Sequence, residues 1–300
     1  MINFAELKSN TYAHGVAFVF FAGVLWSTVG LGIRLIENAG VWQILFYRSI
    51  SLTLFLYIVI HLRGNSKKLL SSDLFTPPNI IGGLSLVAAY SGGIFAIQTT
   101  SVANAMLLFA TAPFIAAILG YLILGEKVRT ITWFAVIISM AGIAYMFSDQ
   151  SIHFSLIGSL AALGSAIGFA IFSVALRWGK NDEMLPSVLS GCFAIIITFF
   201  FCIFLKLSLA LSIKDISISL SMGVFQVGGG LVLYTIGSKT LSAADLTLLS
   251  LAEFVLGPVW VWFFLGEIAS KNTLIGGSIL LLAITANAIS GKRWKPPPIM

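Results

Sequence analysis

The stretch Leu241–Glu267, LSAADLTLLSLAEFVLGPVWVWFFLGE, is an apolar run that is long enough to cross a bilayer and carries one carboxylate, Glu253, near its middle. A second stretch, Ser101–Glu126, SVANAMLLFATAPFIAAILGYLILGE, aligns with it without a gap at a shift of 141 residues (267 minus 126). Both copies end in Leu-Gly-Glu, but Ala112 stands where the later copy has Glu253. A repeat of about half the chain indicates two related halves. At the position of Glu253 the second half carries a charge, whereas the first half carries the apolar Ala112.

The composition points to a membrane protein. Hydrophobic residues make up 58% of the chain and charged residues only 9%, whereas a soluble domain carries about 25% charged residues. Apolar runs of about 20 residues, the length that a spanning helix needs, recur along the whole chain. The sequence therefore predicts an all-α membrane protein and argues strongly against a soluble one.

Ten transmembrane helices are expected, five in each half. They cover residues 12–33, 41–60, 80–98, 102–124 and 131–147, and then 154–176, 185–205, 216–237, 243–265 and 274–289. Five is an odd number, so the second copy must enter the membrane upside down relative to the first. We therefore predict two inverted five-helix repeats, at 1–148 and 152–300, which is an arrangement typical of secondary transporters.

The positive charges set the expected orientation. The formal charge of +6 comes from Lys and Arg residues that are scattered singly between apolar runs, which does not resemble a nucleic-acid-binding face. With the N-terminus inside, most of them fall in the inner loops, as the positive-inside rule requires. The outer loops hold only Arg34, Lys206, Lys214 and Lys271. Both termini are thus predicted to be cytoplasmic.

The repeat also resembles a known family. In the first copy a small residue, a Pro, an apolar run and Leu-Gly-Glu follow one another, from Ala112 and Pro113 to Glu126. This pattern resembles the EamA domain of the drug/metabolite transporter (DMT) superfamily, and the second copy, with Glu253 and Glu267, resembles it too. Further matching positions are Leu25, Trp26, Ser27, Arg48, Thr100, Ser101 and Ala103.

The resemblance implies a secondary carrier of small organic solutes, with a central cavity between the halves. Members of the superfamily carry amino acids, amines, nucleosides, vitamins and nucleotide-linked sugars. The family often has Pro directly after the glutamate of the second repeat, whereas this chain has Phe254 there and Pro258 one turn later. Any kink in this helix is expected to shift accordingly.

Two embedded charges are the first candidates for the solute site. Glu253 lies near the bilayer midplane, where an ionised side chain costs at least about 2.5 kcal/mol, so it binds a cation or amine, carries a coupling proton, or pairs inside the bundle. Arg48 lies about 10 Å below the outer end of its span, where it either faces a polar cavity or snorkels outward. If both face the cavity, Arg48 can hold a carboxylate and Glu253 an amine, which favours a zwitterion.

Aromatic and amide side chains at mid-span complete the candidate set. Aromatic rings can pack on an apolar or cationic solute, or simply on lipid and core. Amides can bond to a solute or, more commonly, to a neighbouring helix. These further candidates for substrate binding or coupling are Trp26, Tyr90, Gln98, Phe225, Gln226 and Tyr234.

Three other features carry expectations. The run Gly228, Gly229 and Gly230 suggests close packing or bending of its helix. Trp260 and Trp262 lie toward the outer end of the ninth span and are expected to be interface anchors. Asp245 and Lys239 lie near the inner end of the bundle and are expected to be solvated, with an inner gate as the alternative.

The leading prediction is a transporter of an amino acid or a related amine or zwitterion, with protons as a candidate coupling ion. Export of drugs or toxic metabolites and import of a vitamin-type or nucleoside-type nutrient are the alternatives. No catalytic residue, metal site or cofactor is expected, because the chain lacks an H-E-x-x-H motif and its three His residues fall near span ends. A membrane-embedded enzyme, a channel and a scaffold are remoter alternatives.

The expected setting follows from the same features. The short loops fit a multi-pass protein of the bacterial inner membrane. Its expected partners are a small-molecule substrate, the lipid bilayer and protons, and no nucleic acid. The expected oligomeric state is a monomer or a homodimer.

Overall fold

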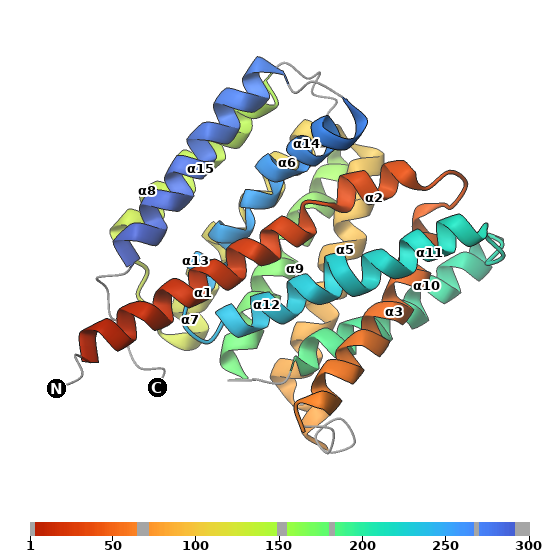
Figure 1. Ribbon diagram of the computed structural model, residues 1–300, viewed down its shortest axis with the longest axis horizontal. Coiled ribbons are helices and arrows are strands. Elements are labelled where there is room, and N and C mark those ends of the chain that lie inside the picture. Colours follow the sequence, from red (N-terminus) through yellow and green to blue (C-terminus); the bar gives the residue numbers. More distant parts are fainter. Residues whose placement is uncertain (1–3, 65–71, 149–154, 180–183, 267–269, 292–300) are drawn as a thin grey trace.

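A bundle of packed helices makes up the part of the chain that the computed structural model describes, residues 4–64, 72–148, 155–179, 184–266 and 270–291 (Figure 1). No strand occurs in these residues. The first half contains α1 (Phe4–Trp26), α2 (Val29–Leu35), α3 (Val41–Leu62), a 3₁₀ turn (Ser72–Phe75), α5 (Pro77–Thr99), α6 (Val102–Phe109), α7 (Ala112–Leu124) and α8 (Thr130–Met146). The second half contains α9 (Leu156–Trp178), α10 (Leu185–Phe204), α11 (Ile213–Ser221), a π-helix (Met222–Gly229), α12 (Gly230–Gly237), α13 (Ala243–Ser250), α14 (Ala252–Leu265) and α15 (Lys271–Gly291).

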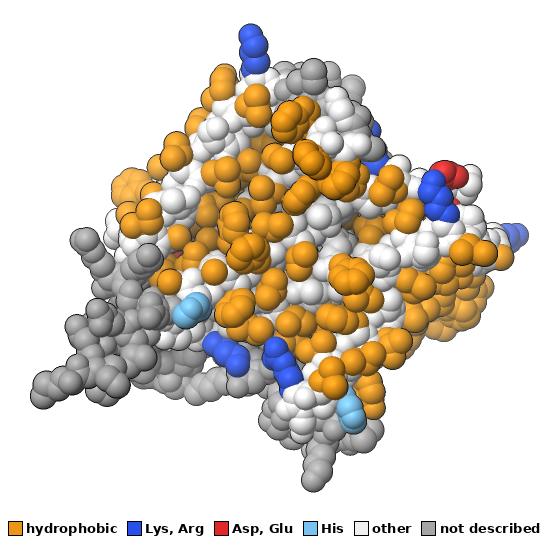
Figure 2. Space-filling model, in the orientation of Figure 1, with side chains coloured by type: hydrophobic (Ala, Val, Ile, Leu, Met, Phe, Trp, Pro, Cys, Tyr) orange, Lys and Arg blue, Asp and Glu red, His pale blue; other side chains and the backbone are white. Residues whose placement is uncertain are grey.

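The predicted number of spans is confirmed. Nine helical segments within the described residues are long and apolar enough to cross a membrane, and Thr130–Met146 is a shorter apolar helix that brings the total to ten. Hydrophobic side chains cover the helices seen in Figure 2, whereas Lys, Arg, Asp, Glu and His side chains gather near the rim. This distribution suits a bundle that is surrounded by hydrocarbon and meets water only at its two ends.

The two halves are interleaved instead of forming separate bodies. α5 packs mainly on α9, α3 on α10, α1 on α12 and α8 on α15, and α7 packs on both α9 and α13, so each of these contacts joins one half to the other. The hydrophobic core likewise draws residues from both halves. The interface between the repeats therefore runs through the centre of the molecule, where transporters of this architecture place their sites.

The packing of α8 against α15 shows the inversion directly. These helices begin at Thr130 and Lys271, which match under the repeat shift of 141 residues (271 minus 130). Arg129, just before α8, contacts Ser290 near the end of α15, so the two helices are antiparallel. At their crossing a Cβ on Gly142 would lie 2.9 Å from the carbonyl oxygen of Gly276, which means that only glycine permits this approach. The prediction of two inverted repeats is confirmed.

Three spans are broken near their middle. α1 ends at Trp26 and α2 begins at Val29, while α6 and α7 are separated at Ala110 and Thr111. α13 and α14 are separated at Leu251, which matches Ala110 under the repeat shift. Two of these three breaks, at Ala110 and Leu251, thus occur at matching positions of the two halves, as in the discontinuous helices that line transporter sites, whereas α9 is continuous where the α1/α2 break would match it.

Local hydrogen bonds explain two of these breaks. The hydroxyl of Ser27 donates to the carbonyl of Val24, and that of Thr28 donates to the carbonyl of Leu25. Thr111 bonds in the same way to the carbonyl of Leu108. Such side chains compete with the helical N–H groups for their acceptors.

The span that contains Pro258 is interrupted before the proline. α14 continues as one helix through Pro258, and the interruption lies at Leu251, two residues before Glu253. Leu251 is 3% exposed, so the interruption lies inside the packed bundle.

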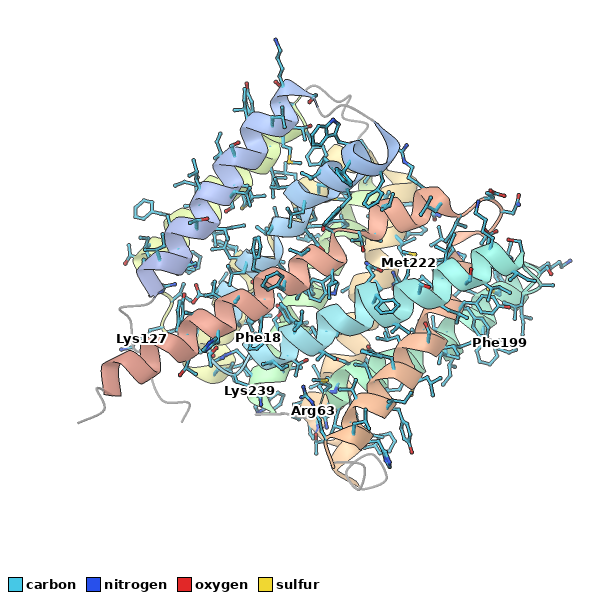
Figure 3. The ribbon with its side chains drawn as sticks, in the orientation of Figure 1. Phe18, Arg63, Lys127, Phe199, Met222 and Lys239 are labelled. Carbon is cyan, nitrogen blue, oxygen red and sulfur yellow. The ribbon has the colours of Figure 1, made fainter. Side chains whose placement is uncertain are left out.

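The end of the bundle that carries Tyr12 and Ser290 is called the terminal end, because α1 begins and α15 ends there. Lys127, Lys239 and Arg63 lie at the same end (Figure 3). This grouping of positive charge supports the expectation that the terminal end faces the cytoplasm. The other end carries Glu37 and Lys214 and is called the opposite end; Glu267 lies outside the described residues.

Candidate solute site

Glu253 lies at the break between α13 and α14, in the first turn of α14. A carboxylate is favoured there by the exposed N–H groups and the positive pole of the helix. Among the residues that the structure describes, none forms a hydrogen bond or an ion pair with this carboxylate, and the side chain is only partly buried. An ionisable side chain that lies inside a span and has no partner in the described part of the chain is costly to keep there.

Arg48 is the second embedded charge, and it does not reach the surface. Its side chain projects from α3 and is only 7% exposed. Its guanidinium carbon lies 5.1 Å from the centre of the Tyr90 ring, a cation–π contact that stabilises the charge. No carboxylate of the described residues pairs with it. Tyr90 is thus the aromatic partner of Arg48 inside the bundle.

A group of rings forms one side of this region. The Trp26 ring centre lies 5.1 Å from that of Tyr234 and 5.8 Å from that of Phe169. Tyr234 is fully buried and its hydroxyl lies 2.7 Å from that of Ser173, so it supports the ring of Trp26 from behind. Trp26 and Phe169 retain some exposure. Phe169, on α9, was missed by the sequence analysis because nothing distinguishes it from the other 23 Phe residues.

The π-helix between α11 and α12 contributes an amide. Gln226 is 8% exposed and donates through Nε2 to the backbone carbonyl of Trp26, at 3.3 Å. Its Oε1 is buried and has no hydrogen-bond partner in the described part of the chain. A π-helical turn widens the backbone and is frequently found at functional sites. Gln226 therefore acts first as a bond between helices, and it keeps one acceptor free beside Trp26.

Gly230 explains the glycine run next to this amide. A Cβ at Gly230 would overlap the indole of Trp26, so the backbone of α12 lies directly against that ring. Close packing, which was the simpler of the two expectations, therefore accounts for this position. Gly228 is required for the same reason, because a Cβ there would lie 2.6 Å from the Phe55 ring.

Replacing Gly230 by Ala is expected to displace the Trp26 ring and to lower stability by about 1–3 kcal/mol, as overpacked cores do. Tryptophan fluorescence and the melting temperature in detergent measure the two effects. Gly164→Ala is the matched control, because a Cβ at that helical position meets nothing within 4 Å. It should raise stability slightly by reducing backbone freedom. Equal effects of both changes would contradict the role of Gly230.

Two sequence candidates lie apart from the others. Gln98 is exposed in the last turn of α5, and Phe225 is 70% exposed and has no ring partner among the described residues. We leave both out of the proposed site. Trp260, which was expected to be an interface anchor, instead donates from Nε1 to the Ser27 hydroxyl at 2.8 Å. Trp260 follows Glu253 by seven residues, which is two helical turns, so the sequence already places both side chains on one face of the helix.

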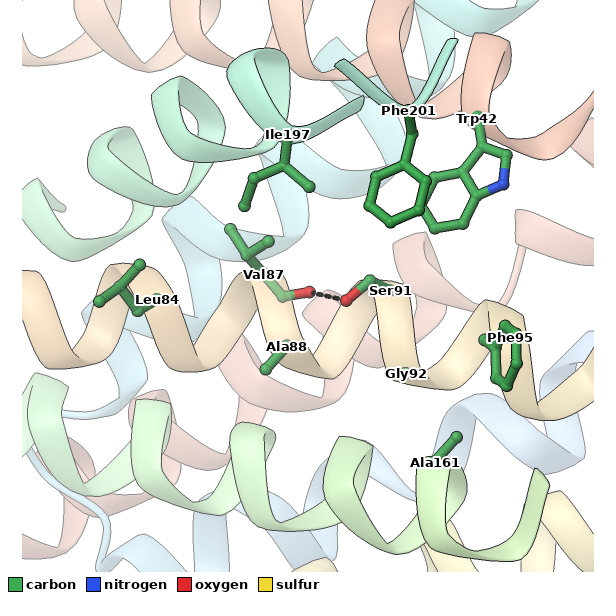
Figure 4. Close-up of a pocket in the computed structure, with 10 residues that line it drawn as sticks. All are labelled: Trp42, Leu84, Val87, Ala88, Ser91, Gly92, Phe95, Ala161, Ile197 and Phe201. Carbon is green, nitrogen blue, oxygen red and sulfur yellow. Dashed lines mark hydrogen bonds between the residues drawn. The ribbon is translucent and has the colours of Figure 1, made fainter. Parts of the chain in front are cut away.

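An open groove of about 470 Å³ lies elsewhere, between α3, α5, α9 and α10 (Figure 4). Trp42 and Phe201 stack at 4.4 Å along its wall. The Ser91 hydroxyl, which lies in this groove, donates to the carbonyl of Val87 in its own helix. The lining is mostly apolar and contains neither Arg48 nor Glu253, so the groove offers no charged group to bind a zwitterion.

About ten spans in two inverted halves, with helix breaks at mid-depth, an acid beside one of them and a buried guanidinium within another span, make up an architecture typical of transporters. Comparison with known families gives the same class. The model of the EamA-like transporter family matches residues 13–148 and 156–288, and the chain belongs to this family.

Individual relatives are distant. The uncharacterized transporter YwfM of Bacillus subtilis is 26% identical over 67% of this chain and 69% of its own length. An uncharacterized transporter of Clostridium kluyveri is 23% identical over 93% and 94% of the two chains. The pseudopaline exporter CntI of Pseudomonas aeruginosa is 22% identical over 81% and 84%. A crystal structure of another protein matches with a TM-score of 0.80 at 18% identity, over 93% of this chain and 98% of that one, which supports the fold.

Proposed function

We propose that the protein is a plasma-membrane carrier of a small zwitterion, such as an amino acid or a related amine, and that Arg48 and Glu253 bind its two charges. The observation that carries this proposal is the presence inside the spans of two opposite charges, neither of which forms an ion pair with a described residue. A solute that carries a carboxylate and an amine would give Arg48 and Glu253 each a partner of opposite charge. The similarity to a pseudopaline exporter supports export as the direction of transport.

Each group has a role that suits its chemistry. The Arg48 guanidinium can hold a carboxylate through two parallel N–H bonds. Glu253 accepts hydrogen bonds from an ammonium group and, when no solute is bound, can hold a coupling proton in its place. Trp26 and Phe169 offer ring surface to the apolar part of the solute. The terminal end, with its excess of positive charge, faces the cytoplasm in this proposal.

A thermal-shift screen tests the substrate class. Purified protein is compared in zwitterions, in amines that lack the carboxylate and in carboxylates that lack the amine. Binding to the folded state alone stabilises it by about 2.7 kcal/mol at 100 times Kd, so a zwitterion should raise the melting temperature more than either partial analogue. Equal shifts with all three would contradict the proposal.

Arg48→Gln should remove the preference for the carboxylate-bearing solute. The expected loss is about tenfold in zwitterion affinity, because a charge-assisted bond is lost while the amine contact remains. Affinity for the amine-only analogue should stay nearly constant, which provides the internal control. Counterflow of labelled solute in proteoliposomes then separates a carrier from a channel, since only a carrier exchanges solute in a saturable manner.

A further inference from the structure

The terminal end of the bundle holds two ion pairs, each of which joins one half of the chain to the other. Glu126 pairs with Arg177, and Arg129 pairs with Asp245 at 2.9 Å. Glu126, Arg177 and Asp245 are 7%, 7% and 2% exposed, and the Arg129 side chain is 7% exposed. Asp245 was expected to be solvated, and the structure buries it instead. Buried pairs are costly to break, because each partner is left as an uncompensated charge.

The first pair fixes the start of α13. Arg177, at the end of α9, also donates to the carbonyls of Ser238 and Leu241 in the turn that precedes α13. Glu126 accepts a bond from the backbone N–H of Ala243, the first residue of α13, at 3.0 Å. The turn between α7 and α8 is thereby tied to the turn between α12 and α13.

The second pair joins three helices and the turn before α8. Arg129 donates to Asp245, to Asn287 Oδ1 at 3.1 Å and to Ser290 at 2.8 Å, and it lies 3.4 Å from the Tyr12 hydroxyl. Asp245 in turn accepts a bond from Asn287 Nδ2 at 2.7 Å. These residues belong to α1, α13, α15 and the turn before α8. A network of this kind, with both charges satisfied, holds its members in one arrangement.

The opposite end has weaker counterparts. Asn104, which matches Asp245 under the repeat shift, forms neutral hydrogen bonds with Thr100 and Ser159. The ion pair found there among the described residues, Lys214 with Glu37, has side chains that are 55% and 62% exposed. Exposed pairs contribute little to stability. Buried Asp215 also joins the halves there, because it accepts bonds from the backbone N–H groups of Glu37 and Asn38. Among the described residues, however, the buried ion pairs that join the halves lie at the terminal end, so the two ends differ in the charges that must be separated to part the halves.

We propose that the pairs Glu126–Arg177 and Arg129–Asp245 form a latch that closes the terminal end and must open before solute passes through it. α13 links the latch to the solute site, since it begins at Ala243 beside Glu126 and ends at Ser250, just before the break at Glu253. Release of the latch frees the start of α13 while its other end stays at the site. The proposal rests on the carrier function, but its test needs no solute, so the two can fail separately.

The test measures access to α13 from each side of the membrane. Ser250→Cys, at a position that is 3% exposed, serves as reporter in a background of Cys192→Ala and Cys202→Ala. A membrane-impermeant maleimide is added to vesicles of each orientation, and Arg63→Cys, exposed at the terminal end, identifies that side. In Asp245→Asn the rate of labelling from the terminal side should rise about tenfold, the effect of losing one charged bond. Glu126→Gln should act in the same direction through the other pair.

Glu37→Gln is the matched control, because it makes the same chemical change in the exposed pair at the opposite end. With Glu37→Gln added, the rate at which the Ser250→Cys reporter is labelled from the terminal side should equal the rate without it. An unchanged rate in both Asp245→Asn and Glu126→Gln overturns the latch. So does an equal rise from both sides, because that result describes a general loosening of the bundle. Melting temperatures show which variants are folded, and if only one of the two latch variants folds, its labelling rate alone decides.

Discussion

Glu253→Gln is expected to weaken solute binding by about 100-fold, since a charge-assisted contact inside the membrane is replaced by a neutral one. Glutamine has nearly the same shape as glutamate, so the break at Leu251 and the packing against Gly23 of α1 should persist. The measurement is the Kd of the solute identified by the thermal-shift screen, together with the melting temperature of the solute-free protein. The melting temperature should hold or rise, because the variant removes a charge that has no partner in the described part of the chain.

The control for this prediction is Glu37→Gln, whose carboxylate is exposed at the opposite end. It should leave the Kd unchanged. If Glu253→Gln also binds solute normally but loses gradient-driven accumulation, Glu253 carries a coupling proton instead of binding the amine. If neither binding nor gradient-driven accumulation changes, the proposed site is wrong.

Arg177→Gln is expected to have the largest effect on stability, a loss of about 3–5 kcal/mol in the free energy of unfolding. The variant leaves Glu126 buried without its cation and removes the donor to the carbonyls of Ser238 and Leu241. Unfolding in mixed detergent micelles, followed by circular dichroism, measures the change. The double variant Arg177→Gln with Glu126→Gln should recover part of the loss, because no buried charge is then stranded.

Lys214→Gln provides the comparison, since it removes the cation of the exposed ion pair with Glu37. Little change is expected, because water solvates both side chains already. A similar loss of stability in Lys214→Gln and Arg177→Gln would show that burial of the pair is not what matters.

The sequence predicts the frame of this fold well. Hydropathy alone gives the ten spans, because hydrocarbon demands long apolar helices and little else resembles them. The repeat from Ser101 to Glu126 adds the inversion. The helix breaks at Ser27 and Leu251 were not predicted. These helices are apolar on all faces, so their hydropathy pattern does not indicate where a neighbouring helix contacts them.

The site is predicted less completely. Glu253 and Arg48 can be identified because charges inside spans are rare and costly. The latch could not be identified, because Arg177 and Glu126 are 51 residues apart and Arg129 and Asp245 are 116 apart, and sequence gives no measure of such distances. Arg129 and Arg177 looked like ordinary topology signals. The available clue was that four ionisable residues of a chain with few charges fall near span ends that are predicted to lie on the same side of the membrane.

The glycine contact between α8 and α15 limits how the halves can move. The backbones of α8 and α15 are in direct contact at Gly142 and Gly276. Sliding one helix along the other would bring larger side chains into this contact, where they would clash. A motion that preserves the contact must therefore be a rotation of one helix about it. Gly142 lies twelve residues from the start of α8, a lever of about 18 Å at 1.5 Å per residue. A swing of about 10° about this pivot moves the tip of such a lever by about 3 Å. That displacement is comparable to the 2.9 Å between Arg129 and Asp245. A small rotation at the glycine contact between α8 and α15 is therefore sufficient to separate this ion pair at the terminal end.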